Sequence, residues 1–272
     1  MKRTIVVTGA NSGIGKAMSL QLAASGHRVA MVCRSAQKGE KALAEIRGGA
    51  VGEVKLFLGD LAKRDDIDRV AAELVDQYGT IDTLCNNAGV HLNKRYETDD
   101  GLEMMYMVNH LAPFLLTEKL MGALEKSSAP RVVTTSSLGH RGARVRWDDM
   151  QCARSFNATI QYCNTKLYNI WFTTELQRRH PKLVASCFHP GAVATGFAQD
   201  DAGMLNTLMK IGKPFLRSST KAARTGTFLA ASDDAADAAG RYYADSKPRK
   251  PSKLARDRES AARLWTLSES QR

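Results

Sequence analysis

Short apolar runs recur along the chain and alternate with segments of helical spacing. The runs cover residues 5–7, 29–32, 54–58, 81–84, 132–135 and 183–188. Because each run is continuously apolar, we predict short strands buried on both faces. After the third run, apolar side chains recur every three or four positions, at Ile67, Val70, Ala71, Leu74, Val75 and Tyr78. That spacing predicts an amphipathic helix.

The alternation of strands and helices predicts an α/β fold. Gly26, Gly79 and Gly89 fall where elements should end or turn. Repeated β-α-β order favours a parallel sheet with helices on both faces. We therefore predict one doubly wound, Rossmann-type domain over residues 1–245. A basic C-terminal extension over residues 246–272 should pack on the same domain.

Composition is that of a globular protein, since 43% of the 272 residues are hydrophobic and 25% are charged. No apolar run reaches the roughly 18 residues that span a bilayer, so we expect no membrane span. The first strand follows the start of the sequence directly, which leaves no room for a signal peptide. Five cysteines without a C-x-x-C pair favour free thiols. Together these features predict a cytoplasmic protein.

The net charge of +11 is concentrated near the C-terminus. Residues 241–263 hold eight basic and three acidic side chains. A basic segment can bind nucleic acid or anionic lipid, or it can be a solvated surface that attracts an anionic cofactor. No series of stacking aromatics and no helix-turn-helix spacing accompanies this charge. We therefore favour the solvated surface and expect no nucleic-acid partner.

A glycine-rich segment, TGANSGIG at residues 8–15, follows the first strand and opens a helix. Glycines let main-chain N–H groups approach a pyrophosphate closely, and a helix N-terminus favours an anion there. The G-x-x-x-G-x-G spacing differs from the G-x-G-x-x-G form of many dinucleotide sites, and a plain turn is the alternative. Its place between strand and helix favours a dinucleotide site.

The end of the second strand distinguishes NADP from NAD. An acidic residue there would bind the ribose 2′-hydroxyl, whereas an arginine accepts a 2′-phosphate. The segment offers Arg34 and Ser35, and the first carboxylate is Glu40. Arg34 can make a charge-assisted contact with the phosphate, and Ser35 can add a hydrogen bond. The sequence therefore favours NADP(H), with an isolated surface arginine as the alternative.

Tyr162 and Lys166 lie one turn apart in a segment of helical spacing. A free tyrosine titrates near 10, too high for a good base at neutral pH. An ammonium about 4 Å away in a partly desolvated site can favour tyrosinate by up to about 4 kcal/mol. We therefore expect the pKa of Tyr162 to fall by roughly 3 units. Alone, a Y-x-x-x-K spacing is common on exposed helices.

Further motifs in the same order give the chain a resemblance to the short-chain dehydrogenase/reductase family along most of its length. They are residues 8–15, Asp60 with Leu61, Asn86 to Gly89, Asn109, Ser136 with Ser137, Tyr162 with Lys166, and Pro190 and Gly191 with Thr195. Residues 108–117, 189–191 and 262–265 are most similar to retinol dehydrogenase-like carbonyl reductases. Three features depart from that group: Thr165 replaces the usual serine, no N-terminal membrane anchor is present, and residues 198–219 are poorly recognisable.

The resemblance implies four catalytic residues. Tyr162 would protonate the carbonyl oxygen, Ser137 would hydrogen-bond it, and Lys166 would hold the ribose and lower the tyrosine pKa. Asn109 would anchor a water that relays protons. Ser137 is preferred to Ser136 because its spacing to Tyr162 matches the group.

The implied cofactor contacts extend along the chain. They are Gly9, Asn11, Ser12, Gly13, Ile14, Gly15, Arg34, Ser35, Asp60, Leu61, Asn87, Ala88, Gly89, Tyr162, Lys166, Pro190, Gly191, Val193 and Thr195. No metal is expected. His140 and His189 lack a partner at a persuasive spacing and are interpreted as structural or site-wall residues.

These features predict an NADP(H)-dependent carbonyl reductase or alcohol dehydrogenase. Its substrate would be a hydrophobic aldehyde or ketone, with a retinal-like molecule as one candidate. A lid over about residues 197–219, with a Met-rich amphipathic helix, suits an apolar substrate, although an ordinary surface helix is equally compatible. A catalytically idle NADP-binding regulatory protein is the alternative. The resemblance also implies a homodimer or a homotetramer.

Overall fold

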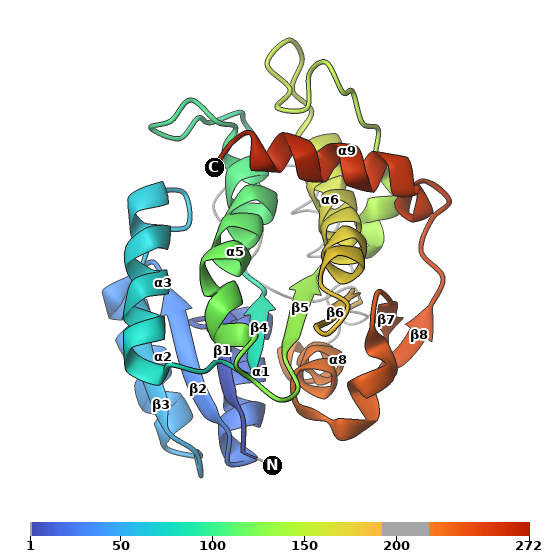
Figure 1. The fold of residues 1–272 in the computed structure, drawn as a ribbon. Helices are drawn as coiled ribbons and strands as arrows, with labels where there is room; N and C mark the ends of the chain where they lie inside the picture. Colours follow the sequence, from blue (N-terminus) through green and yellow to red (C-terminus); the bar gives the residue numbers. More distant parts are fainter. Residues whose placement is uncertain (1, 192–217) are drawn as a thin grey trace.

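The computed structural model describes residues 2–191 and 218–272, whose centre is a single sheet (Figure 1). The strands lie in the order β3–β2–β1–β4–β5–β6–β7–β8. Neighbours run parallel from β3 to β7, and β8 runs antiparallel to β7. The strands are β1 (Thr4–Thr8), β2 (Arg28–Cys33), β3 (Val54–Leu58), β4 (Thr83–Asn86), β5 (Arg131–Thr135), β6 (Val184–Phe188), β7 (Tyr242–Ala244) and β8 (Lys247–Arg249). The order reverses between β1 and β4, where open α/β sheets bind their ligands.

Helices cover both faces of the sheet, which confirms the predicted doubly wound α/β fold. In Figure 1, α3, α5 and α6 lie in front of the strands, and α1 and α8 lie behind them. The helices are α1 (Gly13–Ala24), α2 (Ala36–Arg47), α3 (Arg64–Tyr78), α4 (Met104–Tyr106), α5 (Ala112–Leu124), α6 (Ala158–Arg179), α8 (Ser219–Ala231) and α9 (Arg258–Glu269). The short helices are η1 (Met107–Leu111), η2 (Leu138–Gly142), η4 (Asp233–Ala238) and η5 (Leu254–Arg256).

The central strands are apolar throughout because both of their faces are buried. Val6 packs into the core beneath α3, α5 and α6. Its neighbours Ile5 and Val7 pack into the second core, beneath α1, α2 and α8. All three side chains are fully buried. A strand covered on one face would have alternated with polar residues instead.

The six predicted strands and the helix over residues 67–78 are present. The fourth strand spans Thr83–Asn86 and therefore ends two residues later than expected. Polar Asn86 remains in the buried strand because its side-chain amide donates to Thr117 Oγ1 at 3.0 Å. Strands β7 and β8 are additional. Each has only three residues, and the exposed β8 carries no apolar run.

The C-terminal segment completes the sheet and covers α6. A turn at Asp245 and Ser246, both at positive φ, joins β7 to β8. Helix α9 crosses over α5 and α6 in Figure 1. There the Trp265 ring stacks on Phe172 with ring centroids 6.0 Å apart, and it meets Phe114 edge-on at 5.0 Å.

Candidate active site

The glycine-rich turn leaves no room for side chains between β1 and α1. Gly9 and Gly13 adopt positive φ, at +65° and +52°. A Cβ on Gly15 would lie 2.3 Å from the Gly9 carbonyl oxygen and 2.5 Å from Asn87 Nδ2. The turn therefore depends on glycine at these positions, as the sequence predicts for a backbone that approaches a pyrophosphate.

Thr8 ties this turn to the end of β4. Its Oγ1 accepts the N–H groups of Asn87 and Ala88, at 3.0 and 2.9 Å, and donates to the Cys85 carbonyl. Asn87 Nδ2 donates in return to the Thr8 carbonyl at 2.9 Å. The two segments expected to contact a dinucleotide, residues 8–15 and 86–89, are thereby held together.

The N-terminus of α1 suits an anion. Its N-cap residue, Ser12, makes no side-chain capping hydrogen bond, so that hydroxyl does not satisfy the first N–H groups of the helix. Ile14 packs against the second core and anchors the first turn. With the closely packed glycines, this end of α1 fits the pyrophosphate of a dinucleotide.

Arg34 and Asp60 face each other at the carboxyl ends of β2 and β3. Arg34 is 71% exposed, and its Nη1 lies 4.0 Å from Asp60 Oδ2. Asp60 Oδ1 accepts the N–H of Ala62 at 3.0 Å. Ser35 Oγ caps α2 by accepting from Lys38 N, and Leu61 is buried. An exposed guanidinium at this position can reach a 2′-phosphate.

Lys166 and Asn109 lie together against Gly89. A Cβ on Gly89 would lie 3.2 Å from Asn109 Oδ1 and 3.3 Å from Lys166 Nζ. Lys166 is buried, and its Nζ donates to the Thr135 carbonyl at 3.3 Å. The helices α6 and η1 therefore bring two of the four candidate catalytic residues to the end of β4.

The side chain of Asn109 is largely engaged within the protein. Its Oδ1 accepts from Val90 N at 2.7 Å, and its Nδ2 donates to Val90 O and to Thr165 Oγ1. Both amide hydrogens are thus used. A relay water at this side chain would have only Oδ1 as its partner. Asn109 lies in η1, a single π-helical turn, a form that often occurs at functional sites.

Ser137 and Tyr162 also come together. Both side chains flank Gly139, where a Cβ would lie 3.4 Å from Ser137 Oγ and 3.7 Å from Tyr162 Cε1. The neighbouring Ser136 points the other way and donates to the Lys166 carbonyl at 2.7 Å. The geometry thus places Ser137, and not Ser136, beside the phenol.

The protonation of the pair differs from the expectation. Burial raises the pKa of Tyr162 to about 12, and the nearby Ser137 hydroxyl acts in the opposite direction. Burial lowers the pKa of Lys166 to about 8. The Lys166 ammonium lies 5.6 Å from the centroid of the phenol ring. The expected depression of the tyrosine pKa by this ammonium is therefore wrong for the protein alone, because desolvation of the phenol is the largest cause and raises the pKa.

Two residues near the phenol were not among the predicted site residues. The His91 ring meets Tyr162 edge-on with centroids 5.3 Å apart, and burial lowers the pKa of this histidine. Thr165 Oγ1 donates to the Tyr162 carbonyl and accepts from Asn109. His91 follows residues 86–89 by two positions, and that proximity to the strand end is the signal that could have identified it.

The segment after β6 is described only as far as Gly191. Gly191 has φ +85°, and its N–H donates to His189 Nδ1 at 3.1 Å, beside Pro190. The predicted contacts Val193 and Thr195 lie outside the described residues. The same holds for the expected lid, except for Ser218, which is the N-cap of α8, and Ser219, which is its first residue.

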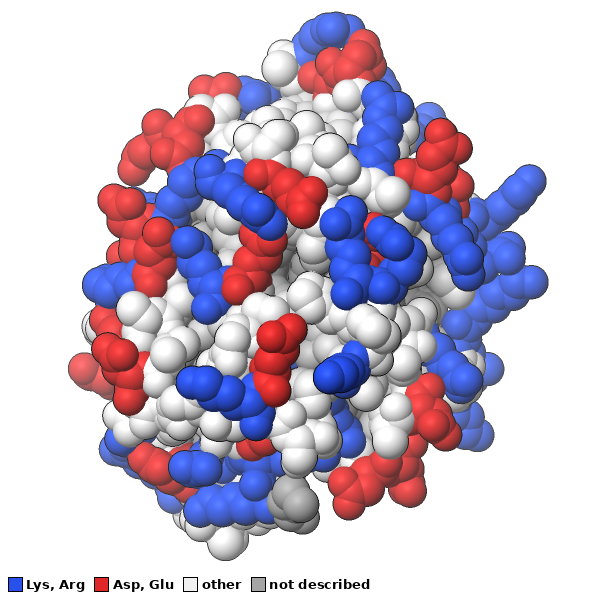
Figure 2. All heavy atoms as spheres, in the orientation of Figure 1, with Lys and Arg blue, Asp and Glu red and all other residues white. Residues whose placement is uncertain are grey.

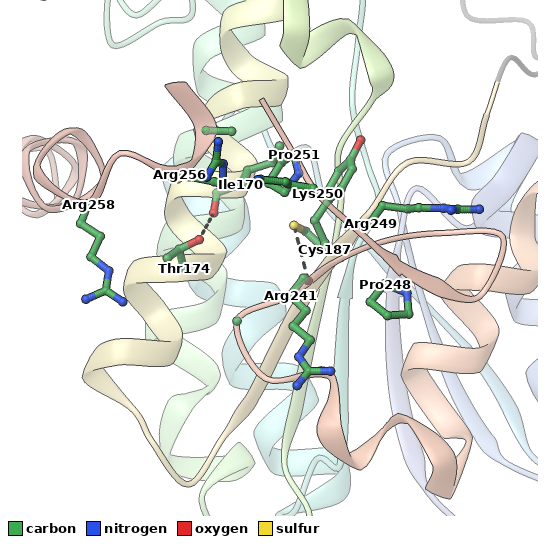
Figure 3. A pocket seen from close by; sticks show the side chains of 13 residues that line it. Ile170, Thr174, Cys187, Arg241, Pro248, Arg249, Lys250, Pro251, Arg256 and Arg258 are labelled. Atoms are coloured by element: carbon green, nitrogen blue, oxygen red, sulfur yellow. Dashed lines mark hydrogen bonds between the residues drawn. The ribbon is translucent and has the colours of Figure 1, made fainter. Parts of the chain in front are cut away.

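The basic residues of the C-terminal segment are exposed on the surface. Figure 2 shows Lys and Arg gathered at the right-hand edge, where Figure 1 places β8. A hollow of about 560 Å³ lies there between α6 and the β7–β8 hairpin. Its lining includes Arg241, Arg249, Lys250, Arg256 and Arg258 and none of the candidate catalytic residues. Cys187 and Arg249 both line this hollow, and Figure 3 shows the Arg249 side chain extending away from Cys187.

The described part of the chain holds neither a membrane-spanning helix nor a cluster of metal ligands. None of its helices is long and apolar enough to cross a membrane. Within the same residues, no three His, Cys, Asp or Glu side chains come together as metal ligands.

Comparisons with known proteins relate the chain to short chain dehydrogenases in both sequence and structure. The family model for short chain dehydrogenases matches residues 3–205. Human retinol dehydrogenase 13 is 36% identical over 98% of this chain and 83% of its own length. Bovine retinol dehydrogenase 12 is 35% identical, with 98% and 85% covered. A crystal structure of an uncharacterized protein from Mycobacterium paratuberculosis has a TM-score of 0.80 and 32% identity, covering 98% of this chain and 92% of that one.

Proposed function

The chain belongs to the short-chain dehydrogenase family, within its retinol dehydrogenase-like members, and we propose that it is an NADP(H)-dependent carbonyl reductase. Its proposed substrate is a hydrophobic aldehyde or ketone. The observation that carries the proposal is the meeting of Ser137, Tyr162, Lys166 and Asn109 beside the glycine-rich turn. A catalytically idle regulator has no need of that convergence, so this alternative is not favoured.

The residues at the turn suit the cofactor. NADPH would be held over residues 8–15 and would supply the hydride to the carbonyl carbon. Arg34 supports the choice of NADP, because its guanidinium is exposed and has only a marginal ion pair with Asp60. Lys166 would bind the ribose hydroxyls beside Gly89.

Proton transfer falls to Tyr162. A phenol with a pKa of about 12 keeps its proton at neutral pH and can donate it to the carbonyl oxygen during reduction. Ser137 would hydrogen-bond the same oxygen and stabilise the charge that develops on it. Lys166, with a pKa of about 8, is mostly protonated at neutral pH and adds a positive charge to a buried site.

The substrate class rests on the relatives that the chain resembles. Two of them are named retinol dehydrogenases, which makes retinal the first aldehyde to test. Medium-chain aliphatic aldehydes and an aromatic ketone complete a panel that separates apolar character from retinoid shape.

The test measures oxidation of NADPH by purified protein with each carbonyl compound. We expect turnover with at least one apolar aldehyde, and a loss of at least about 100-fold in Tyr162→Phe. Tyr78→Phe is the matched control, because Tyr78 lies at the end of α3 and packs against Phe57, remote from the site. Undiminished turnover in Tyr162→Phe would contradict the proposed role of the phenol.

The cofactor preference has a separate test. Parallel assays with NADPH and NADH should show a preference for NADPH, and Arg34→Asp should reverse it. Lys41→Asp introduces the same change of charge on the exposed face of α2 and should leave the preference intact. An unchanged preference in Arg34→Asp would refute the NADP assignment.

A further inference from the structure

His140 is a buried histidine whose two shortest ring hydrogen bonds are to the protein backbone. It lies in η2, three residues after Ser137, and is 1% exposed. Its Nδ1 is 2.7 Å from the Ser137 carbonyl oxygen. On the other side of the ring, Nε2 accepts the N–H of Ser252 at 3.2 Å. The ring therefore bridges the Ser137 loop and the C-terminal segment.

These two bonds define the protonation of the ring. A backbone N–H can only donate, so Nε2 carries no proton. A carbonyl oxygen can only accept, so the proton lies on Nδ1 and is donated to Ser137. Burial lowers the pKa of His140, which agrees with a neutral ring. His140 is thus a fixed donor to the main chain of Ser137.

The contacts around His140 connect the loop to the last strands. Its ring meets Tyr242 of β7 edge-on with centroids 5.1 Å apart, and the Tyr242 hydroxyl lies 3.4 Å from Nδ1. On the other side, Tyr242 stacks on His189 at 5.6 Å, and His189 accepts the N–H of Gly191. The same group of rings therefore touches both the Ser137 loop and the loop after β6.

Ser137 itself is held by few other bonds. Its carbonyl accepts from both the backbone N–H and the ring of His140, at 3.2 and 2.7 Å. Its hydroxyl accepts from Gly139 N at 3.1 Å. Without the ring donor, the peptide after Ser137 would keep only the weaker backbone bond, and the hydroxyl could shift relative to Tyr162.

We propose that His140 is a positioning residue, which fixes the Ser137 hydroxyl against Tyr162 and anchors the Ser137 loop to the C-terminal segment at Ser252. This inference rests on the proposed function of Ser137. It gives the C-terminal segment a part in the geometry of the site although none of its residues is among the four catalytic candidates.

Two conservative substitutions of His140 test separately its bond to the Ser137 carbonyl and its bond from the Ser252 N–H. His140→Asn keeps an amide donor near the place of Nδ1, whereas His140→Gln offers a carbonyl oxygen near Nε2 and loses the donor to Ser137. We expect kcat to fall about tenfold in His140→Gln and by less than about threefold in His140→Asn. KM and the Kd of NADPH should stay unchanged. Equal losses of kcat in the two variants would overturn the proposal.

Action through Ser137 is tested by a double-mutant cycle. Ser137→Ala should lower kcat by about 100-fold, and adding His140→Gln should lower it no further. Independent, multiplicative losses would show that His140 does not act through Ser137. His27→Gln is the matched control, because His27 also accepts a backbone N–H with its ring but lies at the opposite end of the sheet.

An NMR measurement that needs no enzymatic turnover tests this inference separately from the proposed function. In protein labelled with ¹³C at tyrosine Cζ, the Tyr162 signal is assigned by its loss in Tyr162→Phe. Ser137→Ala and His140→Gln should shift that signal in the same direction, while His140→Asn and His27→Gln leave it in place. A Tyr162 signal unmoved by His140→Gln would refute the positioning role, whether or not any carbonyl compound is reduced.

Discussion

Lys166 makes the protein less stable than an apolar side chain would, and this follows from its burial. In the fold, the pKa of Lys166 is lowered from 10.5 to about 8. Below about pH 8 both the folded and the unfolded chain hold the proton, and the folded state bears the full cost of the buried charge. A shift of this size corresponds to about 3 kcal/mol.

Lys166→Met removes that charge and leaves no backbone carbonyl without a hydrogen-bond donor. The Lys166 ammonium donates to the Thr135 carbonyl, but Asn169 Nδ2 also donates to this oxygen at 3.0 Å, so it stays hydrogen-bonded. We therefore expect Lys166→Met to be inactive and yet, near pH 7, to gain up to about 3 kcal/mol in its free energy of unfolding. Inactive but stabilised protein is the signature of a residue retained for chemistry.

The pH dependence of the free energy of unfolding separates the effect of the Lys166 charge from any effect of packing. Between about pH 8 and pH 10.5 only the unfolded chain keeps the proton, so the stability of the wild type rises with pH. The advantage of Lys166→Met should therefore shrink to about 1 kcal/mol near pH 9.5. Urea unfolding of the cofactor-free proteins at both pH values measures this, with Lys182→Met as the exposed control. A difference that does not change with pH would refute the buried-charge argument.

Three further predictions concern the turn, the serines and the phenol. Gly15→Ala should weaken NADPH binding at least about tenfold in calorimetry, since overpacking against the Gly9 carbonyl costs about 1–3 kcal/mol; unchanged affinity would contradict the tight turn. Ser136→Ala should lower the free energy of unfolding by about 1 kcal/mol and change kcat by less than about twofold, whereas Ser137→Ala lowers kcat about 100-fold; equal effects on kcat would reverse their assignment. Alcohol oxidation should speed up as pH rises towards the pKa of Tyr162, while carbonyl reduction should not; parallel pH profiles would exclude the phenol as the proton donor.

The sequence predicts the elements that local patterns determine. Strands β1 to β6 and the glycine-rich turn are found because continuous apolar runs and obligatory glycines depend on near neighbours in the chain. The pairing of Ser137 with Tyr162, which the family resemblance implies, also agrees with the geometry, since both side chains flank Gly139. Strand β8 could not be predicted, because its exposed residues become a strand only through pairing with β7.

Long-range burial explains most of what the sequence did not reveal. One ring nitrogen of His140 bonds the carbonyl of Ser137, three residues earlier, but the other accepts from Ser252, which lies 112 residues away. His91 meets Tyr162 only after β4 and α6 come together. Such contacts join distant segments, so no local spacing predicts them.

The expected pKa of Tyr162 was wrong for a related reason, and the error bears on the chemistry. The spacing of Tyr162 and Lys166 reveals one charge four positions away but not the buried atoms that exclude water from the phenol. With desolvation as the larger cause, the pKa rises to about 12, and the protein alone holds Tyr162 as an acid. An acid is the form that carbonyl reduction consumes, whereas alcohol oxidation must begin from the tyrosinate that burial disfavours. Burial of this one side chain thus keeps the proton that carbonyl reduction needs on the phenol at neutral pH, before any substrate binds.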